Sequence, residues 1–292
     1  EIFAELRGTQ PVYWQDMPRR LVDALESTFP FARFVKTAFD FAGDRIQRIA
    51  SKTLCWAQAA GEHRNEKELL FADTDTVILR NPQPFFEGEG WDVSITCKPE
   101  KVPLNTGVML VRGGMKSAAF LEEWRDETLG ILKNPDRFAE ANDSTQPYGA
   151  PDQMALYQML AYQEGQSLFE CGAKGQRVLV RAMSCSQLNE TNSRPIGGST
   201  FIIHYKGGWQ QILLDGRPFS RFRPRRLSWE MFSHYQKNFL EALACLNSRS
   251  GNHYRAEELG IVVPWYFETD SGNFLPAHYA AWRLKEAAKR AW

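Results

Sequence analysis

The sequence predicts an α/β protein in which a mostly parallel sheet is flanked by helices, with a mainly helical C-terminal extension. Short apolar segments of strand length alternate with longer segments that have the 3.6-residue apolar spacing of a helix. The chain has 292 residues, 43% of them hydrophobic, which is enough to bury the core of one large domain. The composition becomes basic at Arg221. We therefore expect one domain in residues 1–220 and a helical extension in residues 221–292.

The expected strands are short runs of apolar, β-branched and aromatic residues. The first is either 2–6 or 11–14, and the later ones are 31–37, 69–72, 91–96, 108–111 and 201–204.

The expected helices follow from apolar spacing and from residues that favour helix ends. Asp44 is a candidate N-cap, and Pro151 suits the first turn of a helix. The polar stretch 134–151 is long enough to be a functional loop or lid. The predicted helices are 17–27, 44–60, 117–132, 151–163, 229–246 and 277–292.

The composition argues against several classes of protein. The 35 basic and 35 acidic residues give a formal net charge of zero, so no overall field attracts the chain to nucleic acid. No segment has the apolar length of a transmembrane helix. The five cysteines are widely spaced and lack a CxxC pair, which predicts reduced thiols in a cytoplasmic protein. The final helix combines aromatic and basic residues, so peripheral membrane contact stays open beside simple packing on the core.

Two aspartates at the end of an apolar strand carry the clearest chemical signal. Asp73 and Asp75 follow residues 69–72, and side chains two positions apart on extended backbone point roughly the same way. Two neighbouring buried carboxylates repel each other unless a cation lies between them. Mg²⁺ and Mn²⁺ prefer oxygen ligands and are often shared with substrate phosphates. The pair therefore predicts a metal site and a phosphate-bearing ligand.

Four motifs, taken in order, resemble a known family. They are LFADTDTVIL at residues 70–79, LNTGVMLV at residues 104–111, Asp152-Gln153, and HYKGGW at residues 204–209. The series resembles the nucleotide-diphospho-sugar transferases of the GT-A fold, and is most similar to their retaining, glycogenin-like and bacterial α-galactosyltransferase-like branch. The resemblance covers residues 31–209. It implies a GT-A catalytic domain in residues 1–220, with the extension related to the acceptor.

The resemblance also implies roles for individual residues. Asp73, Asp75 and His204 would be the ligands of Mn²⁺ or Mg²⁺. Asp152 would lie beside the transferred sugar and Gln153 close to its anomeric carbon, which makes them the expected catalytic residues. The other expected donor contacts are Lys52, with Arg45 and Arg48 on the same helix face, and Thr74, Asn105, Thr106, Lys206, Gly207 and Gly208.

We therefore expect a metal-dependent glycosyltransferase that moves a hexose from a nucleotide diphosphate, expected to be UDP, to a hydroxyl-bearing acceptor with retention. The sequence leaves the acceptor open among a glycan, a lipid-linked sugar, a protein and a small metabolite. Two other functions also stay open. Asp73 resembles the nucleophile of haloacid-dehalogenase-like phosphatases, and a non-catalytic protein could bind nucleotide sugars or carbohydrate on the same fold.

Overall fold

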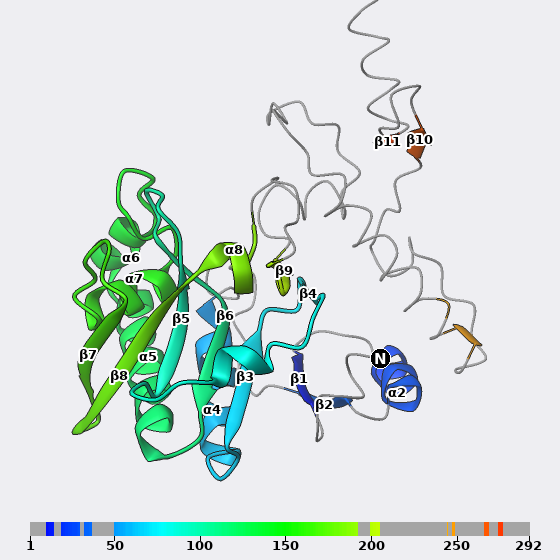
Figure 1. Cartoon of the computed structure of the whole chain (residues 1–292), viewed down its shortest axis with the longest axis horizontal. Helices are drawn as coiled ribbons and strands as arrows, with labels where there is room; N and C mark the ends of the chain where they lie inside the picture. Colours follow the sequence, from blue (N-terminus) through cyan, green and yellow to red (C-terminus); the bar gives the residue numbers. More distant parts are fainter. Residues whose placement is uncertain are drawn as a thin grey trace, which may run out of the picture. The chain divides into compact units, whose positions relative to one another are not determined.

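The structure is a computed structural model (Figure 1). It describes residues 10–14, 19–29, 32–36, 50–191 and 199–204, and a few positions nearer the C-terminus: 244, 247–248, 266–268 and 274–276. The chain divides into two compact units. Most of the described residues belong to the first, whereas helix α2 (Arg19–Thr28) and strands β10 (Tyr266–Glu268) and β11 (Phe274–Pro276) belong to the second.

A five-stranded sheet is the centre of the first unit. Its strand order is β3 (Glu68–Ala72), β6 (Leu104–Arg112), β5 (Val93–Cys97), β8 (Gln176–Ser184) and β7 (Leu168–Ala173). The α/β class is therefore confirmed, but this sheet is mixed, not mostly parallel, since only β5 and β8 pair in parallel. Short connections account for two of the three antiparallel pairs in this sheet. Residues 98–103, between β5 and β6, and the two-residue turn Lys174-Gly175, between β7 and β8, are too short for a crossover helix.

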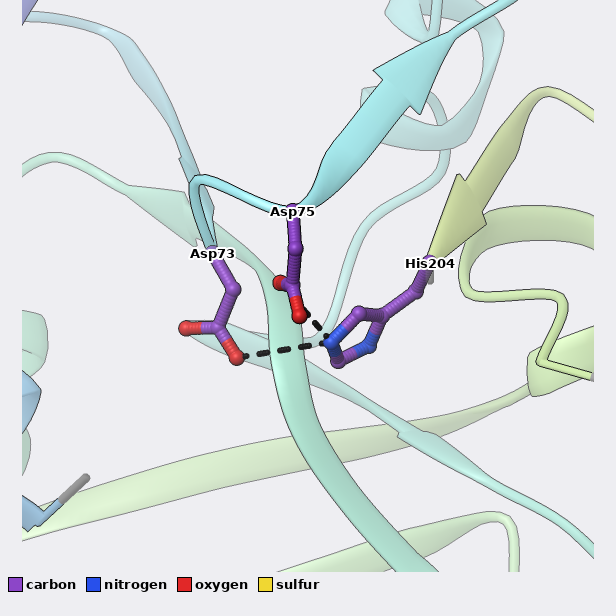
Figure 2. Close-up of side chains that lie close together, drawn as sticks. All are labelled: Asp73, Asp75 and His204. Carbon is purple, nitrogen blue, oxygen red and sulfur yellow. Dashed lines mark ion pairs between the residues drawn. The ribbon is translucent and has the colours of Figure 1, made fainter. Parts of the chain in front are cut away.

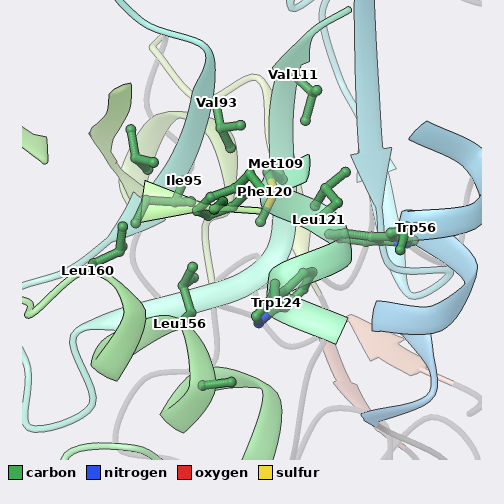
Figure 3. Close-up of a cluster of buried hydrophobic side chains, with 14 of the residues drawn as sticks. Trp56, Val93, Ile95, Met109, Val111, Phe120, Leu121, Trp124, Leu156 and Leu160 are labelled. Carbon is green, nitrogen blue, oxygen red and sulfur yellow. The ribbon is translucent and has the colours of Figure 1, made fainter. Parts of the chain in front are cut away.

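Four helices pack together and contribute to the main core with the sheet. They are α4 (Lys52–Glu62), α5 (Met115–Lys133), α6 (Pro135–Asn142) and α7 (Pro151–Met159). Figure 3 shows Phe120 and Trp124 of α5 against Ile95 and Met109 of the sheet, with Trp56 of α4 beside them. This packing supports the strand ends from which the candidate site residues emerge.

The opposite face of β6 is also covered. Val108 and Leu110 alternate with Met109 and join a second apolar cluster. That cluster includes Phe86 of the short 3₁₀ helix η1 (Gln83–Phe86), Leu188 of α8 (Cys185–Leu188) and Ile202 of β9 (Ile202–His204). A strand buried on both faces reads as a nearly continuous apolar run, as β6 does.

Two smaller strand pairs complete the first unit. Strand β1 (Gln10–Trp14) pairs in parallel with β2 (Ala32–Lys36), so of the two candidate first strands the structure describes the one at 11–14. Strand β4 (Thr76–Ile78) pairs antiparallel with β9.

One further sequence expectation is wrong, one lies outside the described residues, and one element was missed. The described helix α4 begins at Lys52, and Asp44, the predicted N-cap of helix 44–60, lies outside the described residues, so it stays a prediction. The predicted loop 134–151 contains helix α6. The Asn134 side chain caps helix α6 by accepting hydrogen bonds from backbone N–H groups of its first turn, and Pro135 occupies the first position of the helix. The β7–β8 hairpin was not predicted.

The C-terminal extension is mostly outside the described residues, and so is the predicted domain boundary at 220/221. Its described elements are β10 and β11, which pair antiparallel with each other. None of the helices that the structure describes combines the length and the apolar character needed to cross a lipid bilayer.

Candidate functional site

The aspartate pair sits in a tight turn between β3 and β4. The backbone N–H of Asp73 donates to the carbonyl of Gly107 on the neighbouring strand β6 at 2.8 Å. The carbonyl of Asp73 then accepts from both the backbone N–H of Thr76, at 3.1 Å, and its hydroxyl, at 2.8 Å. These bonds hold the turn from both sides, so Asp73 and Asp75 are presented on constrained backbone.

His204 reaches the same place from a distant part of the chain. The β4–β9 pairing places His204 opposite Thr76, and Figure 2 shows its imidazole turned toward both carboxylates. Nε2 of His204 lies 3.1 Å from Oδ1 of Asp75 and 3.7 Å from Oδ2 of Asp73. One ligand atom from each of the three residues lies within 4.8 Å of the other two. The three residues that the sequence predicted as metal ligands therefore lie together.

The charges in this cluster are arranged to favour a cation. Burial raises the pKa of the Asp73 carboxyl, and the nearby Asp75 raises it further, while Lys52 and His204 lower it without reversing the shift. A divalent cation would favour the charged form of both aspartates. Carboxylate oxygens suit Mg²⁺ and Mn²⁺, and imidazole nitrogen is a common ligand of divalent transition metals. The chemistry of the cluster thus fits the predicted metal.

Lys52 links Asp73 to a second carboxylate. Its ammonium Nζ lies 3.0 Å from Oδ2 of Asp73 and 3.4 Å from Oδ2 of Asp152. Burial alone would lower the pKa of Lys52, but the two carboxylates outweigh that effect and raise it. Lys52 therefore stays charged at neutral pH and joins the aspartate pair to the start of helix α7.

The predicted sugar-binding residues meet at the start of α7. Asp152 is 1% exposed, and its Oδ2 accepts a hydrogen bond from the hydroxyl of Thr106 at 2.6 Å. Gln153 follows it and donates from Nε2 to the carbonyl of Leu104 at 2.5 Å. Among the described residues, Oδ1 of Asp152 and Nδ2 of Asn105 are buried without a hydrogen-bond partner. Such atoms are rare in folded proteins, and each calls for an explanation such as a water, an ion or a catalytic role. Nε2 of His63 and Nε1 of Trp91 are also buried without a partner, but these two residues were not predicted site residues.

The remaining predicted contacts do not join this group in the described part of the chain. Thr74 lies between the two aspartates and is exposed. The other five positions fall outside the described residues: Arg45, Arg48, Lys206, Gly207 and Gly208.

Comparison with known proteins decides the family. The model of the nucleotide-diphospho-sugar transferase family matches residues 63–211, which is half of the chain and includes all three residues of the acidic and histidine cluster. The chain belongs to the nucleotide-diphospho-sugar transferase family. This confirms the resemblance found in the sequence and makes the chain a transferase of that class.

Solved glycosyltransferase structures are similar to this transferase at low identity. One, involved in glycosylation of the major capsid of PBCV-1, is 11% identical with a TM-score of 0.42, covering 70% of this chain and 96% of its own. GlyE of Streptococcus pneumoniae TIGR4 is 14% identical with a TM-score of 0.45, over 77% of this chain and 54% of GlyE. An active-site mutant of LgtC is 14% identical with a TM-score of 0.35, over 68% of this chain and 88% of LgtC. No curated protein sequence matches significantly.

Two residues of the transferase site were not singled out by the sequence. Gly107 was noted only as part of the LNTGVMLV motif, yet its Cα faces the imidazole ring, since a β-carbon there would lie 2.1 Å from Cε1 of His204. Asn189 was not assigned to the site, but its Oδ1 lies 2.8 Å from Nδ1 of His204. Both contacts depend on segments brought together by the fold, so no spacing along the chain could have indicated them.

Proposed function

We propose that this transferase moves a hexose from a nucleotide diphosphate sugar, with UDP as the nucleotide, to a hydroxyl-bearing acceptor, and that Asp73, Asp75 and His204 hold Mn²⁺ or Mg²⁺. The observation that carries the proposal is the convergence within 4.8 Å of two carboxylates from the β3–β4 turn and one imidazole from β9. When bound, the metal would act as a Lewis acid that neutralises charge on the departing diphosphate.

The chain's own residues supply the rest of the binding site. Lys52 contributes a charged ammonium next to Asp73, where it can donate to an oxygen of the diphosphate or the sugar. Lys206 and Gly207 follow the metal-binding histidine in the sequence, and we assign them and Thr74 to the diphosphate as well. Their part in the proposal rests on their place in the motif.

The sugar is assigned to the space next to Asp152 and Asn105. The unpaired Oδ1 of Asp152 can accept a hydrogen bond, and the unpaired Nδ2 of Asn105 can donate one. A sugar hydroxyl offers both a donor and an acceptor, so it would satisfy either atom. Thr106 holds the Asp152 carboxylate in place through its hydroxyl.

Retention of anomeric configuration is the stereochemistry we propose, with Gln153 next to the anomeric carbon. The bond from Nε2 of Gln153 to the carbonyl of Leu104 occupies the amide nitrogen. The side-chain oxygen Oε1 is therefore the atom left to approach a sugar that carries developing positive charge. A glycan, a lipid-linked sugar, a protein and a small metabolite are all acceptors consistent with this chemistry.

The test is incubation of the protein with Mn²⁺ and a panel of nucleotide sugars, with and without EDTA. Metal-dependent hydrolysis or transfer from one donor is expected. Phosphatase activity on simple phosphomonoesters would instead support the haloacid-dehalogenase-like alternative, and binding without turnover would indicate a non-catalytic protein.

Substitutions test whether the activity depends on the cluster of Asp73, Asp75 and His204. Asp75→Ala and His204→Ala are each expected to lower turnover at least about a hundredfold while the protein stays folded. Asp136→Ala, on the exposed side of α6, is the matched control and should behave as the wild type. Near-normal turnover in either cluster variant would refute the metal assignment.

A further inference from the structure

The imidazole of His204 has a second nitrogen, and its environment is fully determined by neighbouring side chains. Nε2 faces the two aspartates, whereas Nδ1 lies 2.8 Å from Oδ1 of Asn189. Both His204 and Asn189 are buried, at 3% and 0% exposure, so water does not compete for this contact. The carboxylates beside Nε2 would also accept a proton, but a metal bound there would take the Nε2 lone pair, and the partner of Nδ1 must then accept the proton of the neutral ring.

The orientation of the Asn189 amide follows from a chain of hydrogen bonds. The hydroxyl of Thr96 lies 2.7 Å from the carbonyl oxygen of Asn105, which can only accept, so Thr96 uses its single proton there. The amide group 2.7 Å from the same hydroxyl must then donate to it, which identifies that group as Nδ2 of Asn189. A flipped amide would place its oxygen 3.3 Å from the Asn105 carbonyl, acceptor against acceptor.

The orientation of the Asn189 amide determines which nitrogen of His204 is protonated. With Nδ2 of Asn189 committed to Thr96 and Asn105, its Oδ1 is the atom that faces His204. An amide oxygen only accepts, so Nδ1 of His204 must carry a proton and donate it. The neutral ring then has its lone pair on Nε2, the nitrogen beside Asp73 and Asp75.

The backbone holds Asn189 in this position from both sides. Its N–H donates to the carbonyl of Cys185, the first residue of α8, at 2.8 Å. The next residue, Glu190, donates to the carbonyl of Ile202 at 3.0 Å and accepts from the N–H of His204 at 2.9 Å. Asn189 is thus tied to the strand that carries the histidine, and the two side chains keep a fixed distance.

We propose that Asn189 is a positioning residue that holds the imidazole of His204 in its Nδ1–H tautomer and so keeps the Nε2 lone pair directed at the metal. This inference rests on the metal site proposed above. Hydrogen-bonded neighbours that orient a ligating histidine typically change metal affinity 10- to 100-fold when they are removed. Asn189 has no contact with the donor in this scheme and acts through His204 alone.

The tautomer can be read by NMR with a diamagnetic metal. Long-range ¹H–¹⁵N correlation spectra of the histidine-labelled protein in saturating Mg²⁺ should show a protonated Nδ1 and an unprotonated Nε2 for His204. The His204→Gln variant assigns its signal among the five histidines. A protonated Nε2 beside an unprotonated Nδ1 in the wild type would overturn the proposal.

Metal affinity gives the second readout, by calorimetric titration with Mn²⁺. Asn189→Leu has a similar size but no acceptor, and it is expected to bind Mn²⁺ about 10- to 100-fold more weakly. Asn189→Asp keeps an acceptor facing Nδ1 but loses the donor to Thr96 and Asn105, so it should recover only part of that loss. Thr128→Val removes another buried hydroxyl, bonded to the Trp124 carbonyl on α5, and controls for general loss of a buried hydrogen bond.

The outcomes separate this proposal from the proposed function. Wild-type Mn²⁺ affinity in a folded Asn189→Leu would overturn the role of Asn189 while leaving the metal site intact. Failure of the wild type itself to bind Mn²⁺ would overturn the metal site and the role of Asn189 together, whatever the tautomer. Should Asn189→Leu fail to fold, the wrong wild-type tautomer would still refute the proposal.

Discussion

Gly107 lies directly against the imidazole ring of His204. A β-carbon on Gly107 would be 2.1 Å from Cε1 and 2.3 Å from Nδ1 of that ring, and 3.2 Å from Oδ2 of Asp73. The backbone of Gly107 does not have a positive φ, so glycine is needed here for space and not for conformation. The carbonyl of the same residue accepts from the N–H of Asp73. One glycine on β6 therefore positions both the histidine and the first aspartate.

Gly107→Ala is expected to displace the His204 ring and weaken Mn²⁺ binding at least about tenfold, because neither the ring nor the β6 backbone can move freely in a packed interior. Titration with Mn²⁺ measures the loss, and circular dichroism checks the fold. Gly172→Ala, at an open position on β7 with nothing within 4 Å of the added carbon, is the control. Equal affinity in Gly107→Ala and the wild type would mean that the ring is not held where the structure places it.

Lys52→Met should destabilise the protein in the absence of metal. The substitution leaves Asp73 and the 1%-exposed Asp152 without their shared counter-charge. Removing one partner of a fully buried ion pair costs about 3–5 kcal/mol, and partial exposure of Lys52 (16%) and Asp73 (22%) reduces the expected loss to about 1–3 kcal/mol. Urea unfolding measures it. Lys67→Met, at a lysine that is 92% exposed, should change the free energy of unfolding by less than about 0.5 kcal/mol.

Asp152→Asn should separate sugar recognition from nucleotide recognition. The amide oxygen can still accept from Thr106, so the start of α7 is preserved, but the negative charge is lost. Turnover is expected to fall about 100- to 1000-fold. Affinity for UDP alone should stay near that of the wild type, because the proposed contact of Asp152 is with the sugar. A parallel loss of UDP affinity would place Asp152 against the nucleotide and contradict the assignment.

Short sequence patterns were enough to predict several strands and helices and the proposed metal-binding cluster. The apolar run before Asp73 predicted β3, the helical spacing predicted α5, and the ordered motifs predicted that His204 would join Asp73 and Asp75. Each of these features is written in a few consecutive residues or in a motif that the family shares.

Other features depend on contacts that no local pattern encodes. Strand direction in the sheet follows partly from connection lengths, and the Lys174-Gly175 hairpin has no strong turn dipeptide. Helix α6 is an exception among the missed features. It could have been predicted from Asn134-Pro135, since a capping residue followed by proline is a typical helix start. The bond between Asn189 and Thr96 joins residues 93 positions apart, so only the folded arrangement reveals it.

The cysteines give a prediction about reactivity. Cys55, Cys97, Cys171 and Cys185 are free thiols, and burial raises the pKa of Cys55 and of Cys171 to about 11. At pH 8 only about one thiol in a thousand at these two positions is then the reactive thiolate. In a Cys245→Ser background, pulse alkylation with peptide mapping should find both nearly unmodified in native protein and fully modified in urea.

The pH dependence of that alkylation distinguishes a raised pKa from simple steric protection. A thiol with a pKa near 11 gains about tenfold in thiolate for each pH unit below that value, so native labelling of Cys55 and Cys171 should keep rising from pH 8 to pH 10. A thiol with the ordinary pKa of about 8.5 would level off above pH 9. A plateau at pH 9 in protein that remains folded would contradict the predicted shift, and a flat, near-zero rate would indicate that reagent access, not ionisation, limits the reaction.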